Sequence, residues 1–389
     1  MRDFLDKIRN DVKLSAVDLR RILETEDEKI LEQIFREARR VKHKYAGNKI
    51  YLRGIIEFSN ICAKDCLYCG IRKSNKNVNR FKMAADDIVK LALQAYENNY
   101  DSLVLQGGEI ENEEYASFIE NIVGRIKTGS GGKLGITLSL GEQSPEVYRR
   151  WFAAGAHRYL LRIETSNAEL YGKIHPADHS FRRRLDCLRE IKKAGYQTGT
   201  GVMIGLPGQT MEDLARDILF FAREDIDMLG MGPYVVHDDT PLAKQVAGFD
   251  KGKQLMLGLK MIAACRLYLK DVNIAAATAL QALNNRGREL GVQAGANIVM
   301  PNITDTEYRA AYRLYNDKPC FDEKLWLEDP DETIGYGEWG DSPHFLKKCG
   351  PDRLKPGPPA HDNSSQTNKG TKLKIMKSSI SIFKIGLPN

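Results

Sequence analysis

The sequence predicts a closed barrel of eight parallel strands with helices around it, a (β/α)8 barrel of the α/β class. Short apolar runs alternate with amphipathic helical segments along most of the 389 residues, and this alternation is typical of parallel βαβ units. Eight such runs occur, which is the number of strands in this kind of barrel. Polar or cysteine-containing motifs follow successive runs, as expected where functional residues lie at the carboxyl ends of barrel strands.

The first fifty residues are expected to form helices that cap one end of the barrel. Ser15 is followed three residues later by Asp18, a spacing typical of an N-terminal capping box. Apolar residues then recur at helical spacing between Leu31 and Val41, which predicts an amphipathic helix.

The strand candidates are short, apolar and separated by helical segments. They are residues 51–58, 102–106, 135–140, 158–163, 197–204, 227–232, 273–278 and 296–300. Amphipathic segments between them, such as 85–97, 146–153 and 181–193, predict helices. An open, doubly wound sheet is the alternative, and it is less favoured because there are eight units and no G-x-G-x-x-G phosphate loop.

Charge and composition restrict the class of partner. The net charge is +6, but seven Lys and Arg residues and only two acids lie in 352–389. The rest of the chain is therefore nearly neutral and lacks the excess of basic residues that is typical of proteins that bind nucleic acid. No apolar run reaches the roughly 20 residues that span a membrane. We expect a helical cap over 1–50, the barrel over 51–320, an extension over 321–351 and a disordered basic tail over 352–389.

The most informative motif is a C-x3-C-x2-C loop directly after the first strand candidate. It consists of Cys62, Cys66 and Cys69. Thiolates hold iron–sulfur clusters, and four of them normally complete a cubane, so three leave one iron open for chemistry. Zinc would need a second ligand pair, which is absent. Disulfides would need an oxidising compartment, whereas the sequence has no signal-peptide pattern and an odd number of cysteines, so a reducing cytoplasm is expected.

Further motifs follow the later strand candidates in order. They occupy 106–109, 139–142, 162–165, 205–209, 232–234 and Thr278. In a closed barrel all of these positions face one end, and we therefore expect them to share a site with the cysteine loop.

The cysteine spacing, with Tyr68 before the last cysteine, resembles the radical SAM superfamily. The motifs that follow narrow the resemblance to the HydE family, the radical SAM maturases of FeFe-hydrogenase, from about Leu14 to about Cys320. They are Ser-Leu-Gly-Glu at 139–142, the segment 158–165, Gly-Leu-Pro-Gly-Gln-Thr at 205–210, the pair 232–234 and 239–242, and the segment 295–302. The resemblance implies one 4Fe-4S cluster and S-adenosylmethionine (SAM), which is cleaved reductively to a 5′-deoxyadenosyl radical.

The resemblance also implies roles for individual residues. Cys62, Cys66 and Cys69 would be the metal ligands. The SAM-binding residues would be Tyr68, Gln106, Gly108, Glu109, Ser139, Glu164 and Arg184. Glu164 would accept hydrogen bonds from the ribose hydroxyls. Arg184 would pair with the SAM carboxylate, although Arg182 and Arg183 lie beside it in the sequence.

Residues deeper in the barrel are the candidates for catalysis and for holding the substrate. They are Arg162, Thr278, Tyr312 and Tyr315. Tyr308 is a nearby tyrosine whose ordinary role would be packing. An inward Arg162 that is not paired with an acid would suit an anionic ligand, and the alternative is a structural pair with Glu57 or Glu164.

The implied task is assembly of the di-iron subcluster of the H-cluster from a cysteine-bound iron–carbonyl–cyanide precursor. A reduced electron donor such as ferredoxin and companion hydrogenase maturases would be the partners. Some family members bind a second cluster through three more cysteines; here only Cys320 and the distant Cys349 follow, so no second cluster is expected.

Three alternatives remain. Biotin synthase has auxiliary-cluster cysteines on strands 2, 3 and 5, which the corresponding runs here lack. This sequence resembles a radical SAM mutase like that of the pyrrolysine pathway more closely than it resembles biotin synthase. The same holds for a maturase-like enzyme that acts on another thiol or amino acid. A non-catalytic cluster carrier would need neither the Gly-Gly-Glu turn at 107–109 nor Glu164 nor Arg184.

Overall fold

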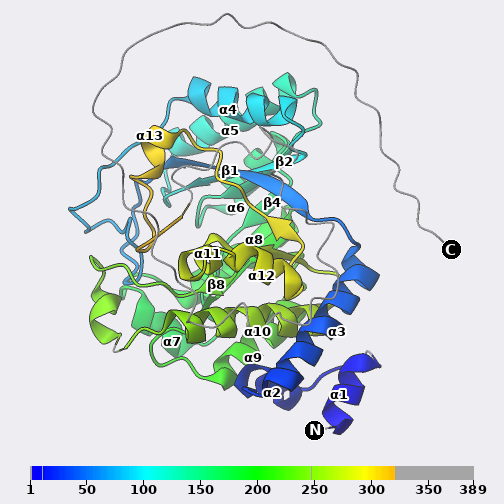
Figure 1. Ribbon diagram of the computed structural model, residues 1–389. Helices are drawn as coiled ribbons and strands as arrows, with labels where there is room; N and C mark the ends of the chain where they lie inside the picture. The colour runs from blue at the N-terminus through cyan, green and yellow to red at the C-terminus, as the bar shows by residue number, and fades with distance from the viewer. Residues whose placement is uncertain (1, 11, 247, 320–389) are drawn as a thin grey trace, which may run out of the picture. The chain divides into compact units, whose positions relative to one another are not determined.

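The computed structural model describes residues 2–10, 12–246 and 248–319. Eight strands close a barrel in the order β1-β10-β9-β7-β5-β4-β3-β2, and each neighbouring pair is parallel. Figure 1 shows the helices arranged around this sheet. The (β/α)8 prediction is confirmed.

The strands lie where the apolar runs predict them. Their bounds are β1 Tyr51–Ser59, β2 Ser102–Gly107, β3 Gly135–Ser139, β4 Arg158–Leu160, β5 Gln197–Thr200, β7 Met228–Leu229, β9 Asn273–Ala276 and β10 Ile298–Val299. Two short strands, β6 Met203–Ile204 and β8 Gly232–Pro233, pair with each other outside the barrel sheet.

Three predicted strands are interrupted near their carboxyl ends. β4 ends at Leu160, and the runs 197–204 and 227–232 are divided into β5 and β6 and into β7 and β8. At the break, the Thr200 hydroxyl accepts from the Ile163 amide at 3.1 Å and donates to the Leu161 carbonyl at 2.8 Å. The Thr200 side chain thus takes the place of backbone hydrogen bonds between the two strands. A pattern of apolar residues along the chain does not predict such a contact.

The helices match the amphipathic segments. Their bounds are α1 Arg2–Arg9, α2 Ala16–Glu24, α3 Glu28–Ala46, α4 Ala85–Glu97, α5 Glu113–Gly129, α6 Pro145–Ala153, α7 Ala168–Ile174, α8 Phe181–Lys193, α9 Met211–Arg223, α10 Lys251–Leu269, α11 Thr278–Leu283, α12 Gly287–Gln293 and α13 Thr306–Arg309, with a 3-10 helix η1 over Pro241–Gln245. Helices α4, α8 and α12 contact β1, β5 and β9 respectively. This is the outer layer that a parallel barrel requires.

The N-terminal helices pack on the outer layer. The capping box is confirmed, since the Asp18 amide donates to the Ser15 hydroxyl at 3.2 Å and the Ser15 amide donates to the Asp18 carboxylate at 2.9 Å. Helix α2 contacts α9 and α10, and α3 contacts α10, as Figure 1 shows for the blue helices. Lys260 of α10 donates to the Leu23 carbonyl at 3.2 Å.

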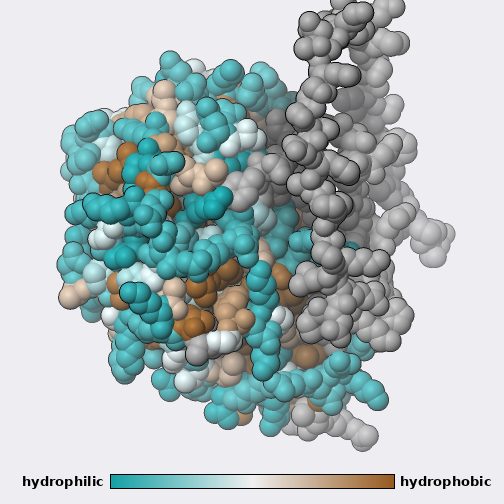
Figure 2. Space-filling view, turned by 60° about the vertical axis from the view of Figure 1, so that its left-hand side comes forward, coloured by the Kyte–Doolittle hydropathy of each residue, from teal (hydrophilic) through white to brown (hydrophobic). Residues whose placement is uncertain are grey.

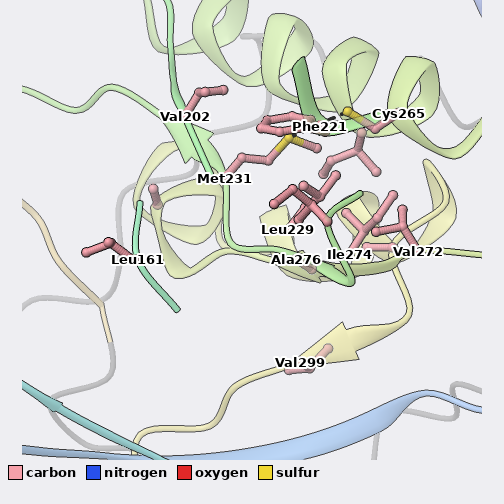
Figure 3. Close-up of a cluster of buried hydrophobic side chains, with 14 of the residues drawn as sticks. Leu161, Val202, Phe221, Leu229, Met231, Cys265, Val272, Ile274, Ala276 and Val299 are labelled. Atoms are coloured by element: carbon pink, nitrogen blue, oxygen red, sulfur yellow. Dashed lines mark hydrogen bonds between the residues drawn. The ribbon is translucent and has the colours of Figure 1, made fainter. Parts of the chain in front are cut away.

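The core lies between the outward faces of the strands and the helices. Figure 3 shows one part of it, where Cys265 of α10 and Phe221 of α9 approach Leu229 and Ile274 of the strands. These side chains are at most 1% exposed. Burial of this apolar layer holds the helices on the barrel and leaves its carboxyl end free for other residues.

The surface on the left of Figure 1 is shown in Figure 2. Hydrophilic residues cover most of this face, and hydrophobic residues appear in small groups near its middle. Among the residues described, no helix is long and apolar enough to cross a membrane.

Several predictions concern residues outside the described ranges. These are the extension over 321–351, the tail over 352–389, and the expected absence of a second cluster at Cys320 and Cys349. They stay predictions, as do the domain boundaries.

Candidate active site

A cavity of about 310 Å³ opens at the carboxyl ends of the barrel strands. The loop 205–209, which was also expected to share the site, does not line this cavity. Every residue that is expected to hold metal, SAM or substrate does lie in its wall. These residues are Cys62, Cys66, Tyr68, Cys69, Gln106, Gly108, Glu109, Ser139, Arg162, Glu164, Arg184, Thr278, Tyr312 and Tyr315. The barrel therefore brings together motifs that are up to 253 residues apart, from Cys62 to Tyr315.

The three cysteines of the loop after β1 are free thiols in this wall. Burial raises the pKa of the Cys62 thiol and of the Cys66 thiol, and raises that of Cys69 to about 12. Backbone amides of Lys64 and Glu109 each lie 3.4 Å from Cys62 Sγ. Bound metal cations would offset the cost of forming three half-buried thiolates, so the donor set fits an iron–sulfur cluster.

The Gly-Gly-Glu turn after β2 packs directly on the cysteine loop. A Cβ at Gly108 would lie 2.1 Å from the Ile61 carbonyl oxygen and 2.8 Å from Cys62 Cβ. The Ala63 amide donates to the Glu109 carbonyl at 2.8 Å. Only glycine permits this approach, so the turn has a steric role in the site.

Glu164 follows β4 in a left-handed backbone conformation, with φ of 64°. Its amide donates to the Gly201 carbonyl at 3.0 Å and its carbonyl accepts from the Met203 amide at 2.9 Å. Burial raises the pKa of its carboxyl, while Arg162 opposes that rise. A non-glycine residue held in this conformation is typical of functional sites.

Arg162 forms an ion pair with Glu164, with Nη2 2.9 Å from Oε2. The alternative pair with Glu57 does not form, because Glu57 is bound to Lys318. Arg162 nevertheless lies in the cavity wall and is about one-third exposed, with 34% of its side chain accessible.

Arg184 is the arginine of α8 that enters the cavity wall. Its Nε lies 2.9 Å from Glu142 Oε1, and its Nη2 lies 3.3 Å from Glu109 Oε2 and 3.0 Å from His179 Nε2. Burial lowers the pKa of Arg184, but Glu109 and Glu142 raise it more, so it remains charged. Its neighbours Arg182 and Arg183 are more exposed: Arg182 pairs with Asp186, and Arg183 pairs with Glu111 and with the second oxygen of Glu142.

The tyrosines and Thr278 line the opposite part of the cavity. The Gln106 amide donates to the Tyr312 hydroxyl at 3.3 Å. Thr278 is the first residue of α11, two residues beyond the end of β9. Tyr308 instead stacks on Phe81, with ring centroids 5.0 Å apart, and it does not line this cavity.

Sequence reasoning missed several polar residues of the site. Lys318 and Glu57 line the cavity as a buried ion pair, and Glu142 and His179 contact Arg184. The inward position of Glu57 on β1 follows from strand alternation. No local sequence pattern indicates that Lys318 contributes to the site, because it lies in a loop 261 residues from its partner Glu57.

Comparison with known proteins shows the family to which the chain belongs. Residues 56–221 match the Radical SAM superfamily. The [FeFe] hydrogenase maturase subunit HydE of Thermotoga maritima is 44% identical over 83% of this chain and 90% of its own length. The 3-methylornithine synthase of Methanosarcina acetivorans is 30% identical over 79% of this chain and 86% of its own.

A solved structure shows the same fold. The crystal structure of methylornithine synthase (PylB) superposes with a TM-score of 0.68 at 25% identity, covering 85% of this chain and 91% of that one. Membership in the superfamily implies a 4Fe-4S cluster and SAM as cofactors. On the 44% identity over most of both chains, this protein is an enzyme of the radical SAM superfamily and belongs to the HydE family of [FeFe] hydrogenase maturases.

Proposed function

We propose that this enzyme cleaves SAM to a 5′-deoxyadenosyl radical and uses it in assembly of the di-iron subcluster of [FeFe] hydrogenase. The observation that carries the proposal is the convergence, in one cavity, of three free thiols, a buried charged network and two tyrosines. The similarity to the Thermotoga maritima maturase supports the choice of client.

Cys62, Cys66 and Cys69 are the proposed ligands of a single 4Fe-4S cluster, with its fourth iron open. Once bound, the cluster supplies the electron for the reductive cleavage of SAM. The chain contributes three half-buried thiols and two backbone amide donors that face Cys62. The close packing of Gly108 on the loop fixes where these groups lie.

The SAM pocket is proposed to lie beside these thiols. The Glu164 carboxylate would accept hydrogen bonds from the ribose hydroxyls, since a charged acceptor binds a diol strongly. Arg184 would pair with the SAM carboxylate while Glu109 and Glu142 hold its guanidinium in place. The remaining members of the pocket wall are Tyr68, Gln106, Gly108 and Ser139.

The substrate is a small molecule, and we propose a cysteine-bound iron–carbonyl–cyanide precursor. The hydroxyls of Thr278, Tyr312 and Tyr315 would donate hydrogen bonds to its anionic groups. Arg162 is paired with Glu164, but it is about one-third exposed and would supply a further donor. These residues position the substrate and exclude water from the cavity, which protects a radical intermediate. A reduced donor such as ferredoxin would supply electrons, and companion maturases would deliver the precursor and receive the product.

A second candidate is a radical mutase that acts on an amino acid. The 30% identity to 3-methylornithine synthase and the shared fold favour it. The cavity residues do not separate the two reactions, because both substrates carry amino acid groups. Strands β2, β3 and β5 contain no cysteine, which argues against the auxiliary cluster of a sulfur-inserting enzyme.

The test begins with anaerobic reconstitution with iron and sulfide, and EPR of the reduced protein with and without SAM. About four irons per chain, a signal that changes with SAM and formation of 5′-deoxyadenosine are expected. Cys66→Ala should lose all three, and Cys187→Ala, which alters a buried thiol outside the cavity wall, should retain them. Restoration of hydrogenase activity in cells that lack their own maturase then separates the maturase from the mutase, which would not restore it.

A further inference from the structure

His179 lies between the cysteine loop and the charged network of Arg184. It precedes Ser180, the N-cap of α8, and it is 5% exposed. Its Nδ1 lies 3.8 Å from Cys66 Sγ, and its Nε2 lies 3.0 Å from Arg184 Nη2. The imidazole therefore spans the gap between a proposed cluster ligand and a guanidinium.

The arginine determines which ring nitrogen carries the proton. A guanidinium has only N–H donors, so Nε2 of His179 offers its lone pair to Arg184. Glu142 Oε1, an acceptor that would favour the other tautomer, lies 3.8 Å from Nε2, which is too far for a hydrogen bond. A neutral imidazole has one N–H, which is then on Nδ1 and faces the Cys66 sulfur. The opposite tautomer would direct two N–H groups at each other over 3.0 Å and a lone pair at the thiolate. A doubly protonated ring would place a cation donor against Arg184.

In the described part of the chain, Cys66 also lacks the backbone amide donors that Cys62 has. Cys62 receives two backbone amides at 3.4 Å, from Lys64 and Glu109. The backbone amide of Ile71 lowers the pKa of Cys69 against the rise that burial causes. Within residues 2–319 as described, no backbone amide donates to Cys66 Sγ, and the His179 ring nitrogen is its hydrogen-bond partner.

We propose that His179 is a positioning residue that donates an Nδ1–H···Sγ hydrogen bond to Cys66 and thereby raises the reduction potential of the bound cluster. A donor at a ligand sulfur withdraws electron density from the cluster and favours the reduced, more negative state. The same imidazole links that sulfur to Arg184, the proposed partner of the SAM carboxylate. The inference rests on the cluster ligation proposed above and not on the identity of the substrate.

The neighbouring His175 provides a matched control. Its Nδ1 lies 2.9 Å from the Tyr171 carbonyl and its Nε2 lies 3.3 Å from the Tyr68 hydroxyl. Both of its nitrogens thus have oxygen partners, and it forms no hydrogen bond to a cysteine sulfur in the part of the chain that the structure describes. Its ring packs edge-to-face on His179, with centroids 4.7 Å apart.

The experiment is an EPR-monitored redox titration of the reconstituted protein and its variants, with iron content measured in each sample. His179→Leu removes the donor, and reduction should become about tenfold less favourable, a shift of about 59 mV to more negative potential. His179→Asn places an amide near the position of Nδ1 and should restore most of the potential. His175→Gln should leave it near the wild-type value. An unchanged potential in a fully loaded His179→Leu protein overturns the proposal.

A second measurement covers the case in which His179→Leu does not load iron. Wild-type protein labelled with 15N-histidine should show a weak 15N coupling and a coupled exchangeable proton in hyperfine spectra of the reduced cluster. Absence of both signals would overturn the proposal, and a strong coupling would do so by making histidine a metal ligand. A wild-type protein that takes up no cluster would refute the proposed function itself, which keeps the two failures distinct.

Discussion

Lys318 and Glu57 form a buried ion pair in the wall of the cavity, with Lys318 Nζ 2.6 and 2.7 Å from the two carboxylate oxygens of Glu57. Lys318 Nζ also donates to the Tyr312 carbonyl at 2.8 Å, and Asn302 donates to Glu57 at 3.0 Å. The pair thereby connects the segment after α13 to β1. Since that segment carries Tyr312 and Tyr315, the wall of the cavity on this side depends on it.

Lys318→Met should destabilise the protein substantially. Removing one partner of a buried pair leaves an uncompensated charge, which costs about 3–5 kcal/mol. The side chains of Lys318 and Glu57 are only 6% and 4% exposed, so solvent screens the pair little. Denaturant unfolding of the reconstituted protein measures the change. The double variant Lys318→Met with Glu57→Gln should recover much of the loss.

The exposed pair Lys251–Asp317 is the control for that experiment. It joins the same segment to α10 at 2.9 Å, but its side chains are 48% and 67% exposed. Lys251→Met should therefore change stability little. Equal losses in Lys318→Met and Lys251→Met would show that the buried pair has no special role.

Glu164→Ala should weaken SAM binding without changing iron content. Loss of hydrogen bonds to a charged acceptor costs about 1.5–3 kcal/mol, or about ten- to 150-fold in Kd. Anaerobic equilibrium dialysis measures the affinity. Glu164→Gly is the matched variant, because glycine accepts the φ of 64° at that position without strain. If the carboxylate itself binds SAM, both variants lose affinity; retained affinity in the glycine variant would assign the effect to backbone strain.

Gly108→Ala should impair cluster loading. A Cβ there would lie 2.1 Å from the Ile61 carbonyl, so the cysteine loop must move. Iron content and the yield of 5′-deoxyadenosine should both fall. In Gly124→Ala the new methyl group meets no atom within 4 Å, and this change inside α5 should stabilise the protein by about 0.5–1 kcal/mol. Normal loading of Gly108→Ala would contradict the packing of the turn on the loop.

Asp217 should make stability fall as pH rises toward neutrality. Burial raises the pKa of this carboxyl to about 7, above its value in the unfolded chain. Between about pH 4 and 7 the folded state therefore holds a proton that the unfolded state has released. The stability that depends on this proton is present at low pH and is lost as the pH rises through 7. The size of this stability contribution is on the order of 4 kcal/mol, because the pKa of Asp217 differs by about three between the folded and the unfolded state.

The comparison of wild type with Asp217→Asn isolates this contribution. The amide oxygen can still accept from the Ser166 amide, which lies 2.6 Å from Asp217 Oδ1. Urea unfolding at pH 5, 6, 7 and 8 should show the variant gaining stability relative to wild type as pH rises. A constant difference across this range would mean that Asp217 does not titrate there.

Local patterns were sufficient for most of the fold. The amphipathic periods of 85–97 and 181–193 predict α4 and α8 with the bounds that the structure shows. The capping box at Ser15 was predictable because both partners lie within one helical turn. The divided strands were not, because the Thr200 side chain bonds to a neighbouring strand and leaves the apolar period unchanged.

The site, like the fold, was predictable only in part. The spacing of Cys62, Cys66 and Cys69 is a local signature, and barrel topology predicts that motifs after successive strands share one end. The resemblance supplied the roles of Glu164 and Arg184. The partners of these residues were not predictable: whether Arg162 pairs with Glu57 or Glu164 depends on which side chains lie adjacent inside the barrel.

The sequence by itself therefore determined the class of barrel, the cysteine loop and several of the residues that line the cavity. These features follow from spacing along the chain, because strand alternation and helical period act over a few residues. Only the tertiary structure decided the Lys318–Glu57 pair, the Arg162–Glu164 pair and the contact of His179 with Cys66. Such contacts depend on strand register and on how loops pack, and interactions between residues far apart in sequence set both.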